Sequence, residues 1–287
     1  MKEGTFVLCA PSWAGSTLLS YLLGGHSKIT SSGGLLWLFS HLAMEDPSHP
    51  VYKMDLLSYV SKGSRHHKQG KLHPMWDSVT LCPMKGLYTS VRKQLGTSWL
   101  SDSSKNTTWT QAMIEAQPNE PAIFVLMHKT PWGSASSGAR HVDKVPTVND
   151  IDIGRIPHWA MSWKQNYNSW RNLFEKYPHI PVVNLPYENL AGNPAGAIRH
   201  LLSGTNLSFE PRMMHWAERE RHQIGGNYFV HQQAMGGKQE VGIDPKIYEA
   251  TAETIGRFLE VPGITEVLEW LGRCPCCGSP RPSTAAD

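Results

Sequence analysis

The sequence has few cysteines, little net charge and no uninterrupted apolar run long enough to cross a membrane. Among its 287 residues are five cysteines, and 27 Lys and Arg stand against 24 Asp and Glu, a formal net charge of +3. Because these cysteines show no disulfide framework, a reducing cytoplasm is the simpler compartment. A balance so close to neutral excludes a strongly basic surface, so we expect neither nucleic acid nor a membrane as partner.

The first 24 residues contain an apolar run but lack the features of a leader. Ser12, Ser16 and Ser20 interrupt the apolar residues, and no small-residue cleavage site follows a clean apolar stretch. The segment is therefore predicted to be neither a signal peptide nor a membrane-spanning helix.

Cysteine is concentrated at the other end of the chain. Cys274, Cys276 and Cys277 lie close together, as in some zinc sites and redox pairs. They lack the second pair of ligands at fixed spacing that is typical of a zinc site, so we expect no metal. The chain also lacks internal repeats and low-complexity linkers. We therefore predict a single α/β domain over residues 1–272, followed by a Cys/Pro-rich tail at 273–287.

Apolar runs of strand length alternate with stretches of helical spacing. Strands are predicted at 5–10, 98–101, 122–127 and 181–185, and helical stretches at 16–24, 35–62, 108–116, 157–177, 194–202, 245–259 and 264–271. The stretch at 157–177 carries Trp159, Trp163, Tyr167 and Trp170 at helical spacing, which favours a stripe that faces the core. The alternation as a whole predicts an α/β fold.

The most informative segment joins the first predicted strand to the first helix. A strand that ends in a turn rich in Gly and hydroxyl groups and restarts as a helix presents backbone N–H groups to an anion, and Gly15, Ser16 and Thr17 fit this pattern. The phosphate loop of kinases needs Gly-Lys-Ser/Thr, but Ser16 follows Gly15 directly. The missing lysine disfavours ATP-dependent phosphoryl transfer, and a purely structural turn fits this segment equally well.

Two further strand ends carry a lysine and hydroxyl groups. Lys129 follows the run at 122–127, and Ser137 comes eight residues later at the expected start of a helix, so the two can hold one phosphate from two sides. A solvated lysine with capping serines is the alternative. Asp102 and Lys105 follow the strand-like run at 98–101. Because ligands of α/β sheets bind beyond the carboxyl ends of the strands, we expect these strand ends to converge on one site.

Four ordered blocks of the chain resemble one family. They are Ser12-Trp-Ala-Gly-Ser-Thr-Leu-Leu19, Asp102-Ser-Ser-Lys105, Lys129-Thr-Pro131 continued to Ser137, and Tyr187-Glu-Asn-Leu190 with Asn193-Pro194. Over residues 5 to about 202 the sequence is thus similar to the sulfotransferases that use 3′-phosphoadenylyl sulfate (PAPS), particularly their broad bacterial branch. The resemblance implies a P-loop-like central parallel sheet flanked by helices.

The resemblance also implies an activity. A sulfuryl group would pass from PAPS to a hydroxyl or an amine or carbamate nitrogen of a small-molecule natural product, releasing 3′,5′-adenosine bisphosphate (PAP) without a metal. The residues that would hold the 5′-phosphosulfate are Trp13, Ala14, Gly15, Ser16, Thr17 and Leu18. Lys129 and Ser137 would hold the 3′-phosphate, Tyr187 would lie near the adenine, and Lys105 would be the cation close to the sulfuryl group.

The sequence departs from the family pattern at three places. Trp13 stands where relatives commonly have Lys or Arg, so the leaving-group cation would come from Lys105 or elsewhere, or activity would be reduced. Lys129 replaces an arginine and gives a point charge instead of a fork. Gly34 stands where many relatives have a glutamate that could act as base. The base is left open, with candidates Asp102, His73 and His222, and a structural role is the alternative for each.

The acceptor side is defined only by region. We expect the acceptor pocket in residues 35–80, with Trp13, Trp37 and Trp76 in or beside it, and a loop at 225–238 closing over the nucleotide. Two other functions are kept. A nucleotide-binding scaffold of the same fold with impaired catalysis would follow from the lost cation at Trp13, and a nucleotide-dependent kinase would require a degenerate phosphate loop.

Overall fold

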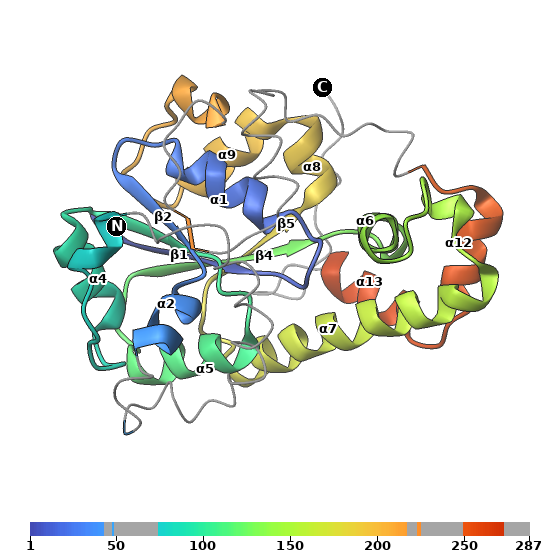
Figure 1. The fold of residues 1–287 in the computed structure, drawn as a ribbon, viewed down its shortest axis with the longest axis horizontal. Helices are drawn as coiled ribbons and strands as arrows, with labels where there is room; N and C mark the ends of the chain where they lie inside the picture. Colours follow the sequence, from blue (N-terminus) through green and yellow to red (C-terminus); the bar gives the residue numbers. More distant parts are fainter. Residues whose placement is uncertain (43–47, 49–73, 217–222, 225–248, 273–287) are drawn as a thin grey trace. The chain divides into compact units, whose positions relative to one another are not determined.

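The computed structural model describes residues 1–42, 48, 74–216, 223–224 and 249–272 (Figure 1). A five-stranded parallel sheet has the order β2-β3-β1-β4-β5. The strands are β1 (Gly4–Cys9), β2 (Ile29–Gly33), β3 (Trp99–Asp102), β4 (Ala122–His128) and β5 (Val182–Pro186). In the β1–β3 and β2–β3 pairs, Gly4 and Ile29 both lie opposite Trp99. The expected parallel sheet and all four predicted strands are confirmed.

β2 was not predicted, because its sequence carries almost no apolar signal. The strand reads Ile-Thr-Ser-Ser-Gly, and its serines are nevertheless buried. Hydrogen bonds replace apolar burial here: Ser31 Oγ lies 2.6 Å from Ser20 Oγ, and Ser32 Oγ donates to the Ser101 carbonyl at 2.8 Å. Satisfied hydroxyl groups can therefore occupy a sheet interior that a hydropathy pattern reads as a loop.

The chain falls into two compact units. The first comprises Met1–Cys9, Ser16–Val125 and Asn193–Val241, and the second comprises Ala10–Gly15, Leu126–Gly192 and Gly242–Asp287. β4 thus begins in the first unit and ends in the second.

The helices of the first unit are α1 (Ser16–Gly24), α2 (Leu35–Leu42), α4 (Leu87–Leu95), α5 (Thr107–Ala116) and α9 (Pro194–Leu202), with 3-10 turns η3 (Pro74–Ser78) and η6 (Pro211–Met214). In Figure 1, α1 and α9 lie above the sheet, and α2 and α5 lie below it. The predicted helices at 16–24, 108–116 and 194–202 are confirmed. Of the stretch at 35–62, the part to Leu42 is helical and nearly all of the rest lies outside the described residues.

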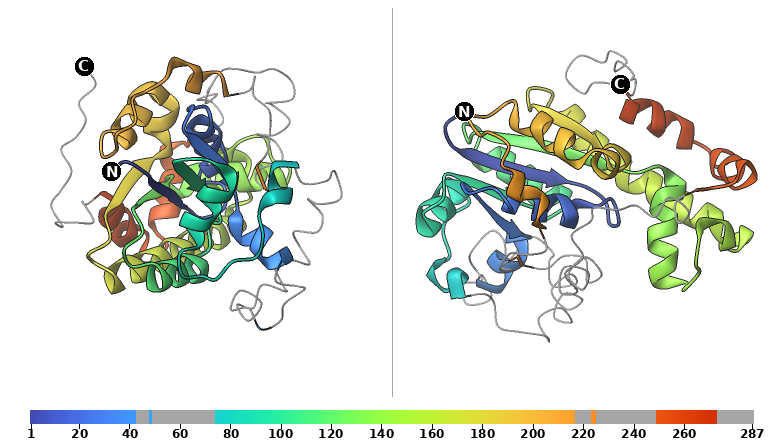
Figure 2. Two further views of the ribbon diagram at one scale, coloured as in Figure 1. Left: turned by 90° about the vertical axis from the view of Figure 1, so that its left-hand side faces the viewer. Right: turned by 90° about the horizontal axis from the view of Figure 1, so that it is seen from above.

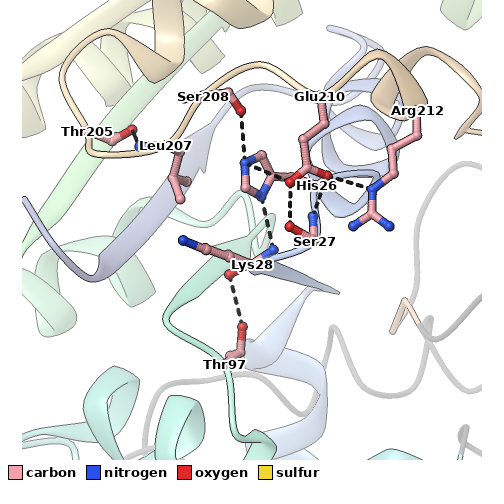
Figure 3. A network of polar contacts seen from close by, with 9 residues as sticks. All are labelled: His26, Ser27, Lys28, Thr97, Thr205, Leu207, Ser208, Glu210 and Arg212. Atoms are coloured by element: carbon pink, nitrogen blue, oxygen red, sulfur yellow. Dashed lines mark hydrogen bonds and ion pairs between the residues drawn. The ribbon is translucent and has the colours of Figure 1, made fainter.

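A polar network in the first unit ties the end of α1 to η6, which lies beside α1 in Figures 1 and 2. Glu210 accepts hydrogen bonds from the Ser27 backbone and side chain and from Arg212, and His26 Nε2 lies 3.0 Å from the Ser208 carbonyl oxygen (Figure 3). Partial burial alone would raise the pKa of Glu210, but these hydrogen bonds outweigh it and lower the pKa to about 2. The carboxylate therefore stays charged and bonded at neutral pH.

The second unit contains α6 (Pro131–Val142), η4 (Val148–Asp150), η5 (Ile153–Arg155), α7 (Ile156–Lys176), α8 (Tyr187–Gly192), α12 (Ala252–Leu259) and α13 (Ile264–Gly272). On α7 the stripe residues Trp163, Tyr167 and Trp170 are buried, as predicted, whereas Trp159 is half-buried and donates to Asp143 at 3.2 Å. The predicted helix start at Pro245 lies outside the described residues, which resume at Glu249. Helix α12 begins at Ala252, because the Thr251 side chain accepts from the Thr254 N–H and caps it.

Candidate functional site

The loop Ala10–Gly15 follows β1 in the chain and leads into α1. Trp13 and Gly15 have φ of 70° and 94°, so both residues adopt the left-handed conformation. Glycine is required at position 15, since a Cβ there would collide with the ring of Tyr187. Ser16, Thr17 and Leu18 form the first turn of α1 and are buried. The predicted order of strand, Gly-containing turn and helix is therefore confirmed.

Lys129, Ser137 and Tyr187 come together within the second unit, and with Trp13 and Gly15 we call them the Lys129 cluster. Lys129 is 3% exposed, and its Nζ lies 3.0 Å from Ser137 Oγ and 3.8 Å from the centroid of the Tyr187 ring. Ser137 sits in the second turn of α6 rather than at its start, because Thr130 caps that helix from the residue before Pro131. About two helical turns after Thr130, the serine lies beside the lysine.

The aromatic stripe of α7 fixes the main chain of Lys129. Trp163 Nε1 donates to the Lys129 carbonyl at 3.0 Å, and the Lys129 N–H donates to Tyr167 Oη at 3.2 Å. Burial raises the pKa of Tyr167 well above its usual range, so its hydroxyl stays neutral. The stripe therefore positions a site residue as well as filling the core, a role that its spacing did not reveal.

Trp13 packs against α6. Its ring lies 4.9 Å from the ring of His141, and a Cβ at Gly138 would come within 3.4 Å of Trp13 Cδ1. The indole is half-buried. Since indole carries no charge, the loop contributes N–H groups and ring surface at this position but no cation.

A second cluster, which we call the Asp102 cluster, lies in the first unit at the end of β3. The Asp102 side chain is 1% exposed and accepts five hydrogen bonds. Oδ1 accepts from Leu35 N at 3.2 Å, Ser104 N at 2.9 Å and Ser104 Oγ at 2.5 Å, and Oδ2 accepts from Tyr88 Oη and Trp109 Nε1, both at 2.9 Å. Burial raises the pKa of Asp102 and the bonds from Ser104, Trp109 and Tyr88 oppose that rise.

Lys105 follows this turn, and its side chain differs from that of Asp102 in burial and in hydrogen bonding. It is half-buried with a φ of 55°, a conformation that a lysine rarely adopts. Within the described parts of the chain, its ammonium forms no hydrogen bond or ion pair. Burial lowers the pKa of Lys105 from its ordinary value of 10.5. An ammonium that is partly desolvated and forms no ion pair with a described residue is suited to bind an anion.

The other predicted residues divide between described and undescribed segments. Trp76 is buried and Trp37 half-buried, but most of the expected acceptor region lies outside the described residues. His73, His222, the loop at 225–238 and the cysteines of the tail also lie outside them. Of the remaining cysteines, Cys9 and Cys82 are buried and form no disulfide.

Residues 1–42, 48, 74–216, 223–224 and 249–272 contain no group of three or more His, Cys, Asp or Glu side chains arranged to hold a metal ion. Over the same ranges, no helix has the length and apolar character needed to span a bilayer.

Comparison with known proteins points to one family. The family model described as "Sulfotransferase family" matches residues 5–211. None of the curated proteins matches the chain.

Solved structures were also compared. A sulfotransferase domain from the Synechococcus PCC 7002 olefin synthase aligns with 16% identity and a TM-score of 0.53, covering 90% of this chain and 95% of that one. A sulfotransferase domain from the curacin biosynthetic pathway aligns with 16% identity and a TM-score of 0.49, covering 90% and 96%. A Mycobacterium avium sulfotransferase aligns with 14% identity and a TM-score of 0.43, covering 90% and 76%. At such identities the first match speaks for the fold alone.

Proposed function

Because the chain belongs to the sulfotransferase family, we propose that it transfers a sulfuryl group from PAPS to a hydroxyl or nitrogen of a small-molecule acceptor. Membership of the family supports sulfuryl transfer itself. The donor, the acceptor class and the residues that act on them are the proposal. We further propose that the enzyme is cytoplasmic and works without a metal.

One observation carries the choice of donor: Lys129 Nζ and Ser137 Oγ lie 3.0 Å apart beside the Tyr187 ring. A buried ammonium and a hydroxyl at this separation can both donate to one phosphate, as the 3′-phosphate of PAPS requires. The ring of Tyr187, which closes on Gly15, offers a flat apolar surface for the nucleoside. We propose that the N–H groups from Trp13 to Leu18, together with the Ser16 and Thr17 hydroxyls, hold the 5′-phosphosulfate.

The reaction exchanges one sulfur bond for another. The acceptor oxygen or nitrogen forms a bond to sulfur while the bond from sulfur to the 5′-phosphate oxygen breaks, and that bonding pair stays on the phosphate of PAP. As in phosphoryl transfer, most of the catalysis comes from positioning and from stabilising charge on the leaving and equatorial oxygens. With an uncharged indole at Trp13, we propose that Lys105 supplies the positive charge that stabilises the equatorial oxygens of the sulfuryl group, which PAP lacks.

A base must take the proton of the acceptor. Since five donors already occupy both oxygens of Asp102, we favour one of the histidine candidates, His222 or His73. A neutral imidazole with an ordinary pKa accepts a proton near neutral pH.

Calorimetric titration of the protein with PAP tests the donor assignment. We expect PAP to bind at least tenfold more tightly than adenosine 5′-phosphate, because only PAP carries the 3′-phosphate. Equal affinity for the two nucleotides, or no binding of PAP, would overturn the proposal. Tight PAP binding without turnover of any acceptor in a panel of phenols, alcohols and amines would favour the nucleotide-binding scaffold instead.

A further inference from the structure

The hydrogen bonds of Asp102 reach four separate parts of the first unit. The carboxylate accepts from the N-terminus of α2 at Leu35, from α4 at Tyr88, from α5 at Trp109 and from its own turn at Ser104. The bond from Ser104 Oγ is short, at 2.5 Å. A carboxylate that accepts from so many donors holds these segments together. It is unsuited to act as a base, because a base needs a lone pair that is open to the substrate.

Ser104 extends the network from Asp102 to Leu36, the second residue of α2. Its Oγ donates to Asp102 and at the same time accepts from the Leu36 N–H at 3.0 Å. The Ser103 N–H donates to the Gly33 carbonyl at 2.6 Å. Both residues between Asp102 and Lys105 are therefore anchored, and Ser104 also satisfies the Leu36 N–H, which has no acceptor within α2.

The chain is anchored again immediately after Lys105. The Asn106 side chain accepts from the Trp109 N–H at 2.9 Å and caps α5, while the indole N–H of the same Trp109 donates to Asp102. Lys105 lies between these anchors with a φ of 55°. A left-handed conformation is strained for a non-glycine residue and persists only where its surroundings impose it.

We propose that Asp102 is a positioning residue for the transfer reaction: with Ser104 it clamps the turn 102–105 so that Lys105 keeps its left-handed backbone and presents its ammonium to the sulfuryl group. This inference rests on the proposed role of Lys105. It removes Asp102 from the candidate bases and predicts that the carboxylate acts only through the lysine.

Asp102→Asn tests the proposal, because the amide keeps the shape but turns one acceptor into a donor that faces donors. We expect kcat to fall at least 30-fold, with the KM for PAPS changing less than threefold. The acid limb of the pH profile, the fall of kcat at acid pH that reports protonation of the base, should be retained because Asp102 is not that base. In a Lys105→Ala background the same substitution should lower kcat by less than threefold further. Loss of the acid limb in Asp102→Asn would overturn the proposal. So would a double variant in which the kcat losses of the two single substitutions multiply.

Two further variants guard against a general loss of folding. Ser104→Ala removes the bridge to Leu36 and keeps the carboxylate, so it should lower kcat in the same way but less, by about fivefold to tenfold. Tyr88→Phe removes one donor on the side away from the turn and should leave kcat within threefold. Equal losses in Ser104→Ala and Tyr88→Phe would show that Asp102 serves stability alone.

Amide hydrogen exchange gives a readout that does not depend on activity. The N–H groups of Leu35, Leu36 and Ser104 should exchange at least tenfold faster in Asp102→Asn than in the wild type, and about as slowly as wild type in Tyr88→Phe. Unchanged exchange in Asp102→Asn would show that Asp102 does not hold the turn. If the wild type fails to bind PAP while exchange in Asp102→Asn changes as expected, the proposed function is wrong but the role of Asp102 in holding the turn is retained.

Discussion

Lys105 and Lys129 both follow a strand of the same sheet, yet the protein treats the two lysines differently. Lys129 is buried, its main chain is held by two side chains of α7, and its ammonium contacts Ser137 and Tyr187. Lys105 has a strained backbone held by the Asp102 cluster, and its ammonium forms no hydrogen bond or ion pair with another described residue. The contacts of the Lys129 ammonium favour a role in binding the ground state of the donor. The Lys105 ammonium, which has no hydrogen-bond partner among the described residues, is suited to stabilise the negative charge that develops during transfer.

Removal of the Lys105 ammonium should give the largest effect. Lys105→Ala is expected to lower kcat by about 10²–10³, the loss typical when one preorganised donor to developing charge is deleted. The dissociation constant for PAP should change less than threefold. Steady-state kinetics and calorimetry on one preparation check both values, with Lys85→Ala as a surface-lysine control. Unchanged turnover in Lys105→Ala would remove the proposed division between the lysines.

Removal of the Lys129 ammonium should weaken binding instead. Lys129→Ala is expected to raise the dissociation constant for PAP by about 30-fold to 100-fold, because a charge-assisted hydrogen bond worth roughly 2–3 kcal/mol is lost. Binding of adenosine 5′-phosphate, which has no 3′-phosphate, should change less than threefold. If both nucleotides lose affinity equally, the lysine contacts another part of the nucleotide or supports the fold.

The pH dependence of turnover should separate the lysines further. Burial lowers the pKa of Lys105 below 10.5, and the protonated form is the active one, so kcat should fall as pH rises through this lowered pKa. Above it, the loss approaches tenfold per pH unit. Lys105→Arg should move this alkaline limb to higher pH, since guanidinium stays charged. An alkaline limb that stays in place in Lys105→Arg would belong to another group.

A glycine pair tests the shape of the loop with a smaller effect. Gly15→Ala places a side chain at a φ of 94° and into the Tyr187 ring, so we expect a loss of roughly 1–3 kcal/mol in stability or PAP binding. Gly256→Ala in α12, where a Cβ meets nothing within 4 Å, should be neutral or stabilise by about 0.5–1 kcal/mol. Thermal unfolding and calorimetry of both variants provide the comparison. Wild-type behaviour of Gly15→Ala would show that the tight loop is dispensable.

The sequence predicted the parts of this comparison that depend on local spacing. Lys129 and Ser137 meet because eight residues separate them across the start of a helix, and the strand ends follow from short apolar runs. The supporting contacts were missed, since they join distant segments: Asp102 is bonded to Leu35, 67 residues away, and Lys129 to Trp163, 34 residues away. No one-dimensional pattern distinguishes an aromatic residue that only fills a core from one that also donates a hydrogen bond to a site.

The side-by-side dissociation constants for PAP of the wild type, Lys129→Ala and Lys105→Ala test the central claim most directly. The account predicts tight binding to the wild type, nearly equal binding to Lys105→Ala, and binding at least 30-fold weaker to Lys129→Ala. Equal weakening in the two variants, or no PAP binding to the wild type, would contradict it.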